Sequence, residues 1–214
     1  MLKYILYAIL SGLLLAMGWP SKGFPLLLFF GFVPLLFAEN KIAQMTDLKR
    51  KGWKIFGLAY LAFFIWNAIG IWWLHYAQEL NSEGQWQNSW TAYLFPVFAN
   101  ALLMSLVFQL YHWVKSKAGN FYSIPFFAAI WICFEKFHLN WEMTWPWFNL
   151  GNGFANYPKW IQWYEYTGTF GGTLWVLVGN LIVFYFLYGY LNLKEKKLRN
   201  KLIVYTLLWI GIPI

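Results

Sequence analysis

Long apolar runs separated by clusters of charge constrain this chain more than any other feature of its sequence. Only 11% of the 214 residues are charged, whereas a soluble domain carries roughly 25%. A bilayer core about 30 Å thick requires about 20 apolar residues in a crossing helix. The pattern therefore predicts an all-α fold, a polytopic membrane helix bundle.

Seven apolar runs are expected to cross the membrane and to form one transmembrane domain over residues 1–214. Their approximate limits are 2–19, 24–38, 55–77, 91–114, 123–137, 167–191 and 202–214. The second and fifth are short for a bilayer, so they either extend into their flanks or lie tilted among other helices. Trp19-Pro20 makes a poor cleavage site, so the first run is expected to be a retained helix and not a signal peptide.

Basic residues favour one side of the predicted bundle. With the N-terminus inside, 13 of the 16 Lys and Arg residues fall in cytoplasmic segments, as the positive-inside rule requires. This bias accounts for the net charge of +8 without a nucleic-acid partner, and the basic loops are expected to face anionic lipid.

Tryptophan is distributed in the opposite way. Ten of the 16 tryptophans lie at or beyond the expected outer interface, and two flank the inner one, whereas an aromatic belt decorates both interfaces. Two interpretations remain open. The bias reflects chance together with ordinary anchoring, or the outer face is a functional surface where indoles hold acyl chains and head groups.

Several polar or small residues lie within the expected spans. Asn67, Asn100 and Asn180 fall near the middle of helices, where amides serve as interhelical hydrogen bonds or line a substrate pathway. A Gly-x-x-x-Gly beginning at Gly168 favours close helix packing. The single cysteine, Cys133, is expected to be buried and inert. With one cysteine there is no multi-cysteine metal site, and we expect neither a metal nor a cofactor.

Glu135 differs from these residues because it places a carboxylate near the outer end of the fifth helix. A carboxylate within a membrane span is costly and marks a candidate functional site. Its expected partners are Lys136, His138, His75 or His112. Both a structural pairing and a direct contact with substrate remain open for it.

Catalytic motifs of the common hydrolases and nucleotide-binding proteins are missing from these residues. The sequence contains no Gly-x-Ser-x-Gly elbow, no His-Glu-x-x-His and no P-loop. No catalytic residue is therefore assigned within this chain.

The segment from Glu135 to Asn180 resembles one known family, the apolipoprotein N-acyltransferases. Their motif has a glutamate that ends a helix, a basic residue three positions on, and then Gly-Phe-Pro-Trp-x-x-x-Gly. Here the matching residues are Glu135, His138 and the run Thr144-Trp-Pro-Trp-Phe-Asn-Leu-Gly151. Further matches are Pro158-x-x-Ile161-Gln162-x-x-Glu165-x-x-Gly168, Trp175, Asn180, Trp72-Trp73-Leu74 and Asn100-Ala101-Leu102.

The chain departs from that family at three positions and in length. His138 stands where an arginine is common, Trp145 replaces a phenylalanine and Thr144 a glycine. Family members continue into a nitrilase-like domain that supplies a Glu-Lys-Cys triad, and these 214 residues lack it. We therefore expect a fragment or truncated product that is inactive alone.

The resemblance implies the membrane domain of an enzyme of the bacterial cytoplasmic (inner) membrane, with its Trp-rich loops in the periplasm. Its acyl donor would be a phospholipid and its acceptor a diacylated apolipoprotein, joined through a thioester acyl-enzyme. The alternative is a non-enzymatic lipid-binding scaffold or a small transporter.

Eight residues are the expected contacts of substrate or lipid. Pro146 and Trp147 would shape a lipid-facing wall, and Gly151 would let the loop fold closely. Glu135 and Glu165 would hold the loop or meet a head-group amine. The full set is Glu135, His138, Trp145, Pro146, Trp147, Asn149, Gly151 and Glu165.

Overall fold

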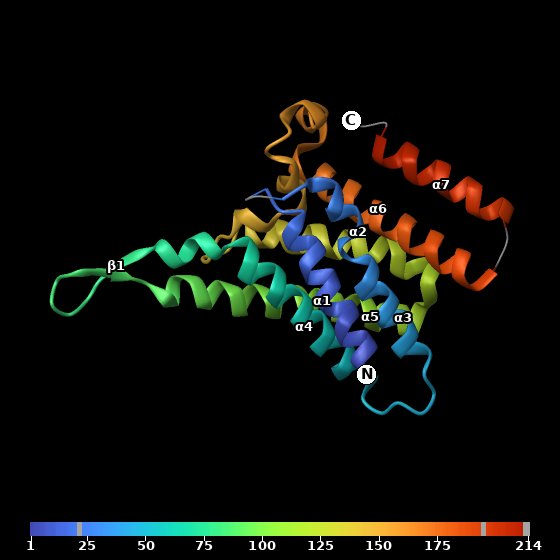
Figure 1. Cartoon of the computed structure of the whole chain (residues 1–214), viewed down its shortest axis with the longest axis horizontal. Coiled ribbons are helices and arrows are strands. Elements are labelled where there is room, and N and C mark those ends of the chain that lie inside the picture. The colour runs from blue at the N-terminus through green and yellow to red at the C-terminus, as the bar shows by residue number, and fades with distance from the viewer. Residues whose placement is uncertain (21–22, 194–195, 212–214) are drawn as a thin grey trace.

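Helices make up almost the whole of the computed structural model, which describes residues 1–20, 23–193 and 196–211 (Figure 1). The α-helices are α1 (Leu2–Met17), α2 (Leu28–Gly31), α3 (Val33–Gln44), α4 (Lys51–Gly70), α5 (Trp90–His138), α6 (Tyr164–Leu193) and α7 (Lys196–Gly211). Short 3-10 helices are η1 (Pro25–Leu27), η2 (Trp72–Tyr76), η3 (Pro146–Phe148), η4 (Leu150–Phe154) and η5 (Pro158–Trp160). Four described segments are long and apolar enough to cross a membrane: Pro25–Gln44, Lys51–Gly70, Trp90–His138 and Tyr164–Gly189. The all-α membrane bundle predicted from the sequence is confirmed.

Helix α5 is two antiparallel helices joined at Gly119. The φ angle of Gly119 is 78° and its geometry is non-helical, a conformation that glycine adopts without strain. The ring of Phe127 lies 6.0 Å from Phe108 and 4.8 Å from Tyr111. In a straight helix Phe108 and Phe127 would be about 28 Å apart, so the chain reverses between them.

The expected second span is also interrupted, and Asn180 of α6 bridges the interruption. Its Oδ1 accepts a hydrogen bond from the Phe32 amide at 2.8 Å, and its Nδ2 donates to the carbonyl oxygens of Leu28 and Val176 at 2.7 and 2.9 Å. Pro34, in the first turn of α3, supplies no amide hydrogen. The prediction of an interhelical amide is confirmed for Asn180, which fastens the junction of α2 and α3 to α6.

The expected third helix, 55–77, differs most from the structure. Helix α4 begins at Lys51 and ends at Gly70, and the chain then forms a 3-10 turn, η2 (Trp72–Tyr76). Strands β1 (Gln78–Leu80) and β2 (Trp86–Asn88) follow as an antiparallel hairpin. Figure 1 shows this arm projecting from the bundle. The hairpin was not predicted from the sequence; its residues are too polar and too few to extend an apolar span.

Helix α7 packs against α6 through a reciprocal pair of tryptophans. Trp175 Nε1 donates to the Trp209 carbonyl oxygen at 2.7 Å, and Trp209 Nε1 donates to the Trp175 carbonyl oxygen at 3.0 Å. Helix α7 begins at Lys196, earlier than the expected start at 202. Residues 212–214 of that expected span lie outside the described residues.

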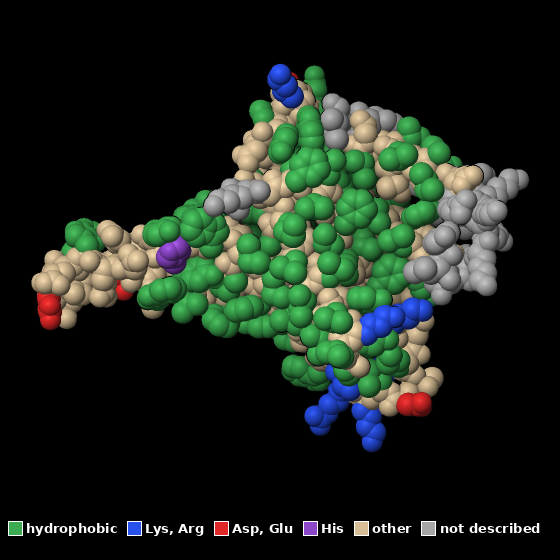
Figure 2. Space-filling view, in the orientation of Figure 1, with side chains coloured by type: hydrophobic (Ala, Val, Ile, Leu, Met, Phe, Trp, Pro, Cys, Tyr) green, Lys and Arg blue, Asp and Glu red, His purple; other side chains and the backbone are tan. Residues whose placement is uncertain are grey.

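The end of the bundle opposite the arm carries basic residues and one buried ion-pair network. Glu39 accepts hydrogen bonds from His112 Nδ1 at 2.8 Å and from Lys115 Nζ at 2.5 Å. Lys and Arg side chains gather there around the loop between α3 and α4 (Figure 2). We call this region the basic end. His112, one of the expected partners of Glu135, is therefore a partner of Glu39 instead.

Candidate functional site

Glu135 lies at the centre of a hydrogen-bonded clamp at the end of the bundle opposite the basic end. Its side chain is 1% exposed. Oε1 accepts from the Leu150 amide at 2.8 Å and from Trp131 Nε1 at 3.2 Å, and Oε2 accepts from Thr173 Oγ1 at 2.6 Å. The carboxylate thereby joins the end of α5, the following loop and α6.

The partners of Glu135 differ from those predicted. In the described residues its donors are a backbone amide, an indole and a hydroxyl, and none is a basic side chain. Three neutral donors satisfy a buried carboxylate because each supplies an N–H or O–H in place of the water it has lost. Thr173 was missed because it lies 38 residues away in sequence, so no local pattern marks it.

Thr173 and Tyr164 extend the clamp to Gly151. Thr173 Oγ1 accepts from the Gly151 amide at 3.1 Å, and the Tyr164 hydroxyl donates to the Gly151 carbonyl oxygen at 2.9 Å. Both polar groups of Gly151 are thus bonded to side chains from the start of α6. The loop is held through its own backbone.

Glycine at position 151 is required by the close approach of the loop to α6. A Cβ atom there would lie 2.0 Å from the Thr169 carbonyl oxygen, and one at Gly172 would lie 2.9 Å from the Gly151 Cα. The Gly-x-x-x-Gly predicted to pack two helices therefore contributes Gly172 to a helix–loop contact. Gly168 itself interrupts α6, with φ at 64°.

Phe148 anchors the other side of the loop. Its ring stacks on Trp19 with centroids 4.9 Å apart and meets Trp66 edge-on at 5.0 Å. The buried Asn149 that follows accepts the Asn152 amide through its carbonyl oxygen at 2.8 Å. Asn152 in turn donates through Nδ2 to the Pro146 carbonyl oxygen at 2.8 Å. The segment 146–152 is therefore fixed to the bundle at both ends.

Three tryptophans form an aromatic wall on the outside of this fixed loop. Trp147 lies 4.7 Å from Trp145 and 5.8 Å from Trp73, measured between ring centroids, and both pairs are edge-on. Trp147 is 47% exposed and Trp73 is 41% exposed, while Trp145 and Pro146 are half-buried. We call this group the tryptophan wall.

His138 lies beside the wall with an unused ring nitrogen. Its ring is buried against Phe134 and stacks on Trp141 at 5.2 Å with an interplanar angle of 11°. Among the described residues, His138 Nε2 and the Nε1 atoms of Trp141 and Trp145 are buried without a hydrogen-bond partner. Buried polar atoms are usually bonded, so these three nitrogens are unsatisfied hydrogen-bonding groups beside the wall.

Two residues singled out from the sequence stand apart from this cluster. Glu165 is exposed at the start of α6, and its amide bonds to the Gln162 carbonyl oxygen at 3.2 Å. Cys133 is exposed and not buried as predicted, because its position on α5 faces away from the core that contains Trp131 and Phe134.

An apolar groove of about 400 Å³ opens beside the Trp-rich loop, which is the segment 139–163 between α5 and α6. Phe24, one of its lining residues, lies 6.3 Å from Trp160 of that loop, measured between ring centroids. The groove is lined by Ala16, Met17, Gly23, Phe24, Leu27, Ile69 and Trp72. Aromatic and aliphatic side chains thus surround a space suited to a hydrocarbon chain.

The described residues contain no group of three or more His, Cys, Asp or Glu side chains placed to hold a metal ion. Glu135 already accepts three hydrogen bonds in the clamp. The arrangement is therefore suited to holding an amphiphile and to positioning a loop.

Comparison with known proteins shows similarity to one family. The family profile described as "Apolipoprotein N-acyltransferase N-terminal domain" matches residues 11–182. The curated protein named "Apolipoprotein N-acyltransferase" from Chlorobaculum tepidum is 24% identical over 178 residues, which cover 82% of this chain and 30% of that protein. The chain thus spans about 30% of the length of the curated relative it matches. No solved structure matches.

Proposed function

The chain belongs to the family of the apolipoprotein N-acyltransferase N-terminal domain, and on that premise we propose that it is the membrane part of such an enzyme. The reaction would move an acyl chain from a phospholipid to the α-amino group of the S-diacylglyceryl-cysteine of a lipoprotein. A cysteine thiolate outside these 214 residues would first displace the lysophospholipid from the acyl ester, forming a thioester. The amino group would then displace the thiolate and form an amide.

The observation that carries this proposal is the tryptophan wall, held on a fixed loop beside an apolar groove. Exposed indoles combine an apolar face with a polar N–H, so they suit the boundary between acyl chains and head groups. The groove of about 400 Å³ would take part of an acyl chain. A small movement of the wall that exposes the unpartnered nitrogens of His138, Trp141 and Trp145 would let them bond to phosphate or ester oxygens, and histidine contributes no permanent charge.

The clamp would position this surface and take no part in bond making. Glu135, Thr173 and Tyr164 bind the loop backbone, which fixes Trp147 relative to the bundle. A preorganised site lowers the cost of ordering its substrate. Asn149 and Gly151 belong to this supporting role, and Glu165, being exposed, would meet a head-group amine.

The basic end would face the cytoplasm and the tryptophan wall the periplasm, in a bacterial inner membrane. The uneven charge supports this orientation. Labelling with a membrane-impermeant maleimide tests it, using Cys133→Ser as the background. We expect Ser82→Cys, in the arm, to react in intact spheroplasts and Thr46→Cys, in the basic end, to react only after lysis. The reverse pattern would contradict the orientation.

The activity is tested on the polypeptide as cells make it, purified from membranes with this segment included. The substrates are a phospholipid with an isotope-labelled acyl chain and a synthetic peptide that begins with S-diacylglyceryl-cysteine. Mass spectrometry should show the peptide gaining one labelled acyl chain. Lipid binding without any transfer would refute the enzyme and favour the lipid-binding scaffold.

A further inference from the structure

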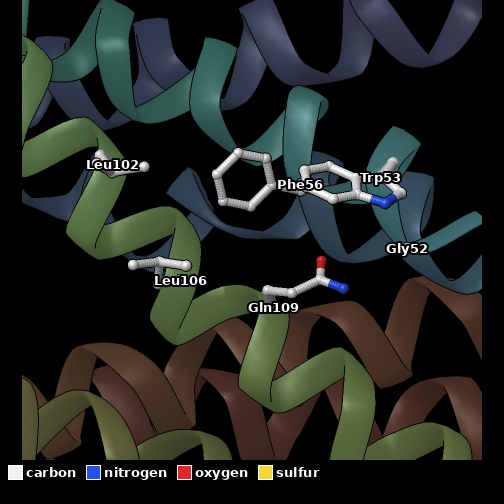
Figure 3. Close-up of a pocket in the computed structure, with 6 residues that line it drawn as sticks. All are labelled: Gly52, Trp53, Phe56, Leu102, Leu106 and Gln109. Atoms are coloured by element: carbon white, nitrogen blue, oxygen red, sulfur yellow. The ribbon is translucent and has the colours of Figure 1, made fainter.

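A second groove lies on the side of α4 and α5 near the basic end, far along the bundle from the tryptophan wall. It encloses about 510 Å³ and is lined by Gly52, Trp53, Phe56, Leu102, Leu106 and Gln109. Figure 3 shows Phe56 and Trp53 of α4 facing Leu102, Leu106 and Gln109 of α5 across this space. Both helices belong to segments able to span the membrane, so this groove opens to the hydrocarbon of a bilayer leaflet.

The groove is apolar along most of its length and polar at one end. Leu102 and Leu106 are 45% and 47% exposed, and from Leu102 to Gln109 the lining runs for about 10 Å of helix. Among the described residues Gln109 Oε1 has no hydrogen-bond partner. An acyl chain fits the leucine end, and the glycerol hydroxyl or amine of a lipid head group fits the amide end.

A basic segment adjoins this groove, since Gly52 and Trp53 of its lining belong to that segment. The segment from Asp47 to Lys54 contains Lys49, Arg50, Lys51 and Lys54 against one acidic residue. Lys49 and Arg50 are exposed, and Trp53 beside them is 75% exposed, as expected of a side chain at the head-group level.

Helix α4 itself adds to this positive potential. It begins at Lys51, has no side-chain cap and has no acidic residue in its first turn. The unsatisfied amides and the dipole of a helix N-terminus attract anions. Asp47 offsets only one of the four positive charges of this segment, so a further anion is favoured among them. The neighbouring Lys115 already has Glu39 as its partner.

We propose that the α4–α5 groove binds one anionic glycerophospholipid of the leaflet at the basic end. One of its acyl chains lies between Phe56 and the two leucines, and its phosphate lies near Lys49 and Arg50. This site is separate from the tryptophan wall and does not depend on the proposed acyl transfer.

The test measures phospholipid retention by native mass spectrometry of the full chain released from detergent. Dioleoylphosphatidylglycerol and dioleoylphosphatidylcholine are the probes, since they differ in head-group charge. We expect the anionic dioleoylphosphatidylglycerol to be retained at a lower lipid concentration than dioleoylphosphatidylcholine. The Lys49→Gln, Arg50→Gln double variant should lose about thirtyfold in apparent affinity for dioleoylphosphatidylglycerol, or about fivefold for each basic side chain. Lys159→Gln, at the opposite end, is the control and should change nothing.

A second pair of variants tests the groove itself. Leu106→Trp fills the groove and should lower retention of both lipids, whereas Leu110→Trp adds the same side chain at an exposed position of α5 outside the lining and should not. Equal retention of the two lipids by the unmodified chain would overturn the proposal. Unchanged retention of dioleoylphosphatidylglycerol by the Lys49→Gln, Arg50→Gln double variant would also overturn it. This second result tests the proposal even if Leu106→Trp fails to fold. If the unmodified chain is a dimer and Leu106→Trp makes it a monomer, the groove binds a second copy of the chain and not a lipid.

Discussion

Replacement of Thr173 by valine should release the Trp-rich loop without changing the shape of the core. Valine matches threonine in size but lacks the hydroxyl, so the variant loses the 2.6 Å bond to Glu135 and the 3.1 Å bond from the Gly151 amide. A hydrogen bond to a charged group contributes about 1.5–3 kcal/mol and a neutral one about 0.5–1.5 kcal/mol. Together they predict that local opening of the loop becomes easier by about 2–4 kcal/mol.

Amide hydrogen exchange measures that opening directly. Peptides covering residues 145–155 should exchange about 30- to 1,000-fold faster in Thr173→Val, because the Leu150 and Gly151 amides lose protection. Peptides from α4 should exchange as before, which distinguishes local opening from global unfolding. Glu135→Gln keeps an acceptor for the Leu150 amide, so its effect should be smaller.

The matched control for this experiment is Thr144→Val. Thr144 is exposed in the same loop, and its hydroxyl donates to the Trp141 carbonyl oxygen at 2.8 Å. An exposed bond of this kind changes stability by at most about 0.5 kcal/mol. If exchange of residues 145–155 is equal in the two variants, the clamp does not hold the loop and the reasoning is refuted.

Three further variants test other parts of the structure. Gly151→Ala should destabilise the folded chain by about 1–3 kcal/mol in a detergent unfolding titration, because the added Cβ would lie 2.0 Å from a backbone oxygen. Gly57→Ala is the control and should not destabilise it, since no atom lies within 4 Å of a Cβ at that position. Equal effects of the two variants would contradict the close packing at Gly151. Asn180→Leu should lower the free energy of unfolding by about 1–3 kcal/mol in the same titration, since it leaves a backbone amide and a carbonyl oxygen unpaired at the junction of α2 and α3. An unchanged free energy of unfolding would mean that this junction needs no hydrogen-bond partner. Trp147→Ala should lower acyl transfer by the polypeptide purified from cells about tenfold, because apolar contact with the lipid is lost. Trp113→Ala, at an exposed position of the basic end, is the control and should leave transfer unchanged. Full activity of Trp147→Ala would show that the tryptophan wall is not part of the site.

The helical class and the approximate positions of the long segments could be predicted because hydropathy is a local and additive property of the chain. Runs such as 55–77 are apolar for enough residues to require a helix. Their exact ends were less predictable, because the chain leaves α4 at Gly70 for a 3-10 turn in which most residues are hydrophobic, as in the helix before it. The hairpin at 78–88 carries too few residues of strand character to be recognised.

Glu135 illustrates how far a sequence can lead to a site. Its unusual position identified it as important, and its proximity to Lys136 and His138 suggested the wrong partners. One actual donor, Trp131, lies one helical turn before Glu135. The other two are the Leu150 backbone amide and the distant Thr173 hydroxyl, and neither of these is visible in a residue pattern. Cys133 shows the same limit, since its neighbours are apolar whether it faces the core or lipid.

The sequence by itself determined that this protein is a helical membrane bundle with a basic end, because crossing a bilayer requires apolar runs whatever the arrangement of the helices. It also marked the Trp-rich segment after Glu135. Only the tertiary structure decided which side chains hold that segment, that the reversal expected between the spans 91–114 and 123–137 falls at Gly119, and that an uncapped, basic helix end meets an apolar groove. The physical reason is that hydrogen bonds and cavities depend on distances of a few ångströms between residues far apart in the chain, which the folded packing alone sets.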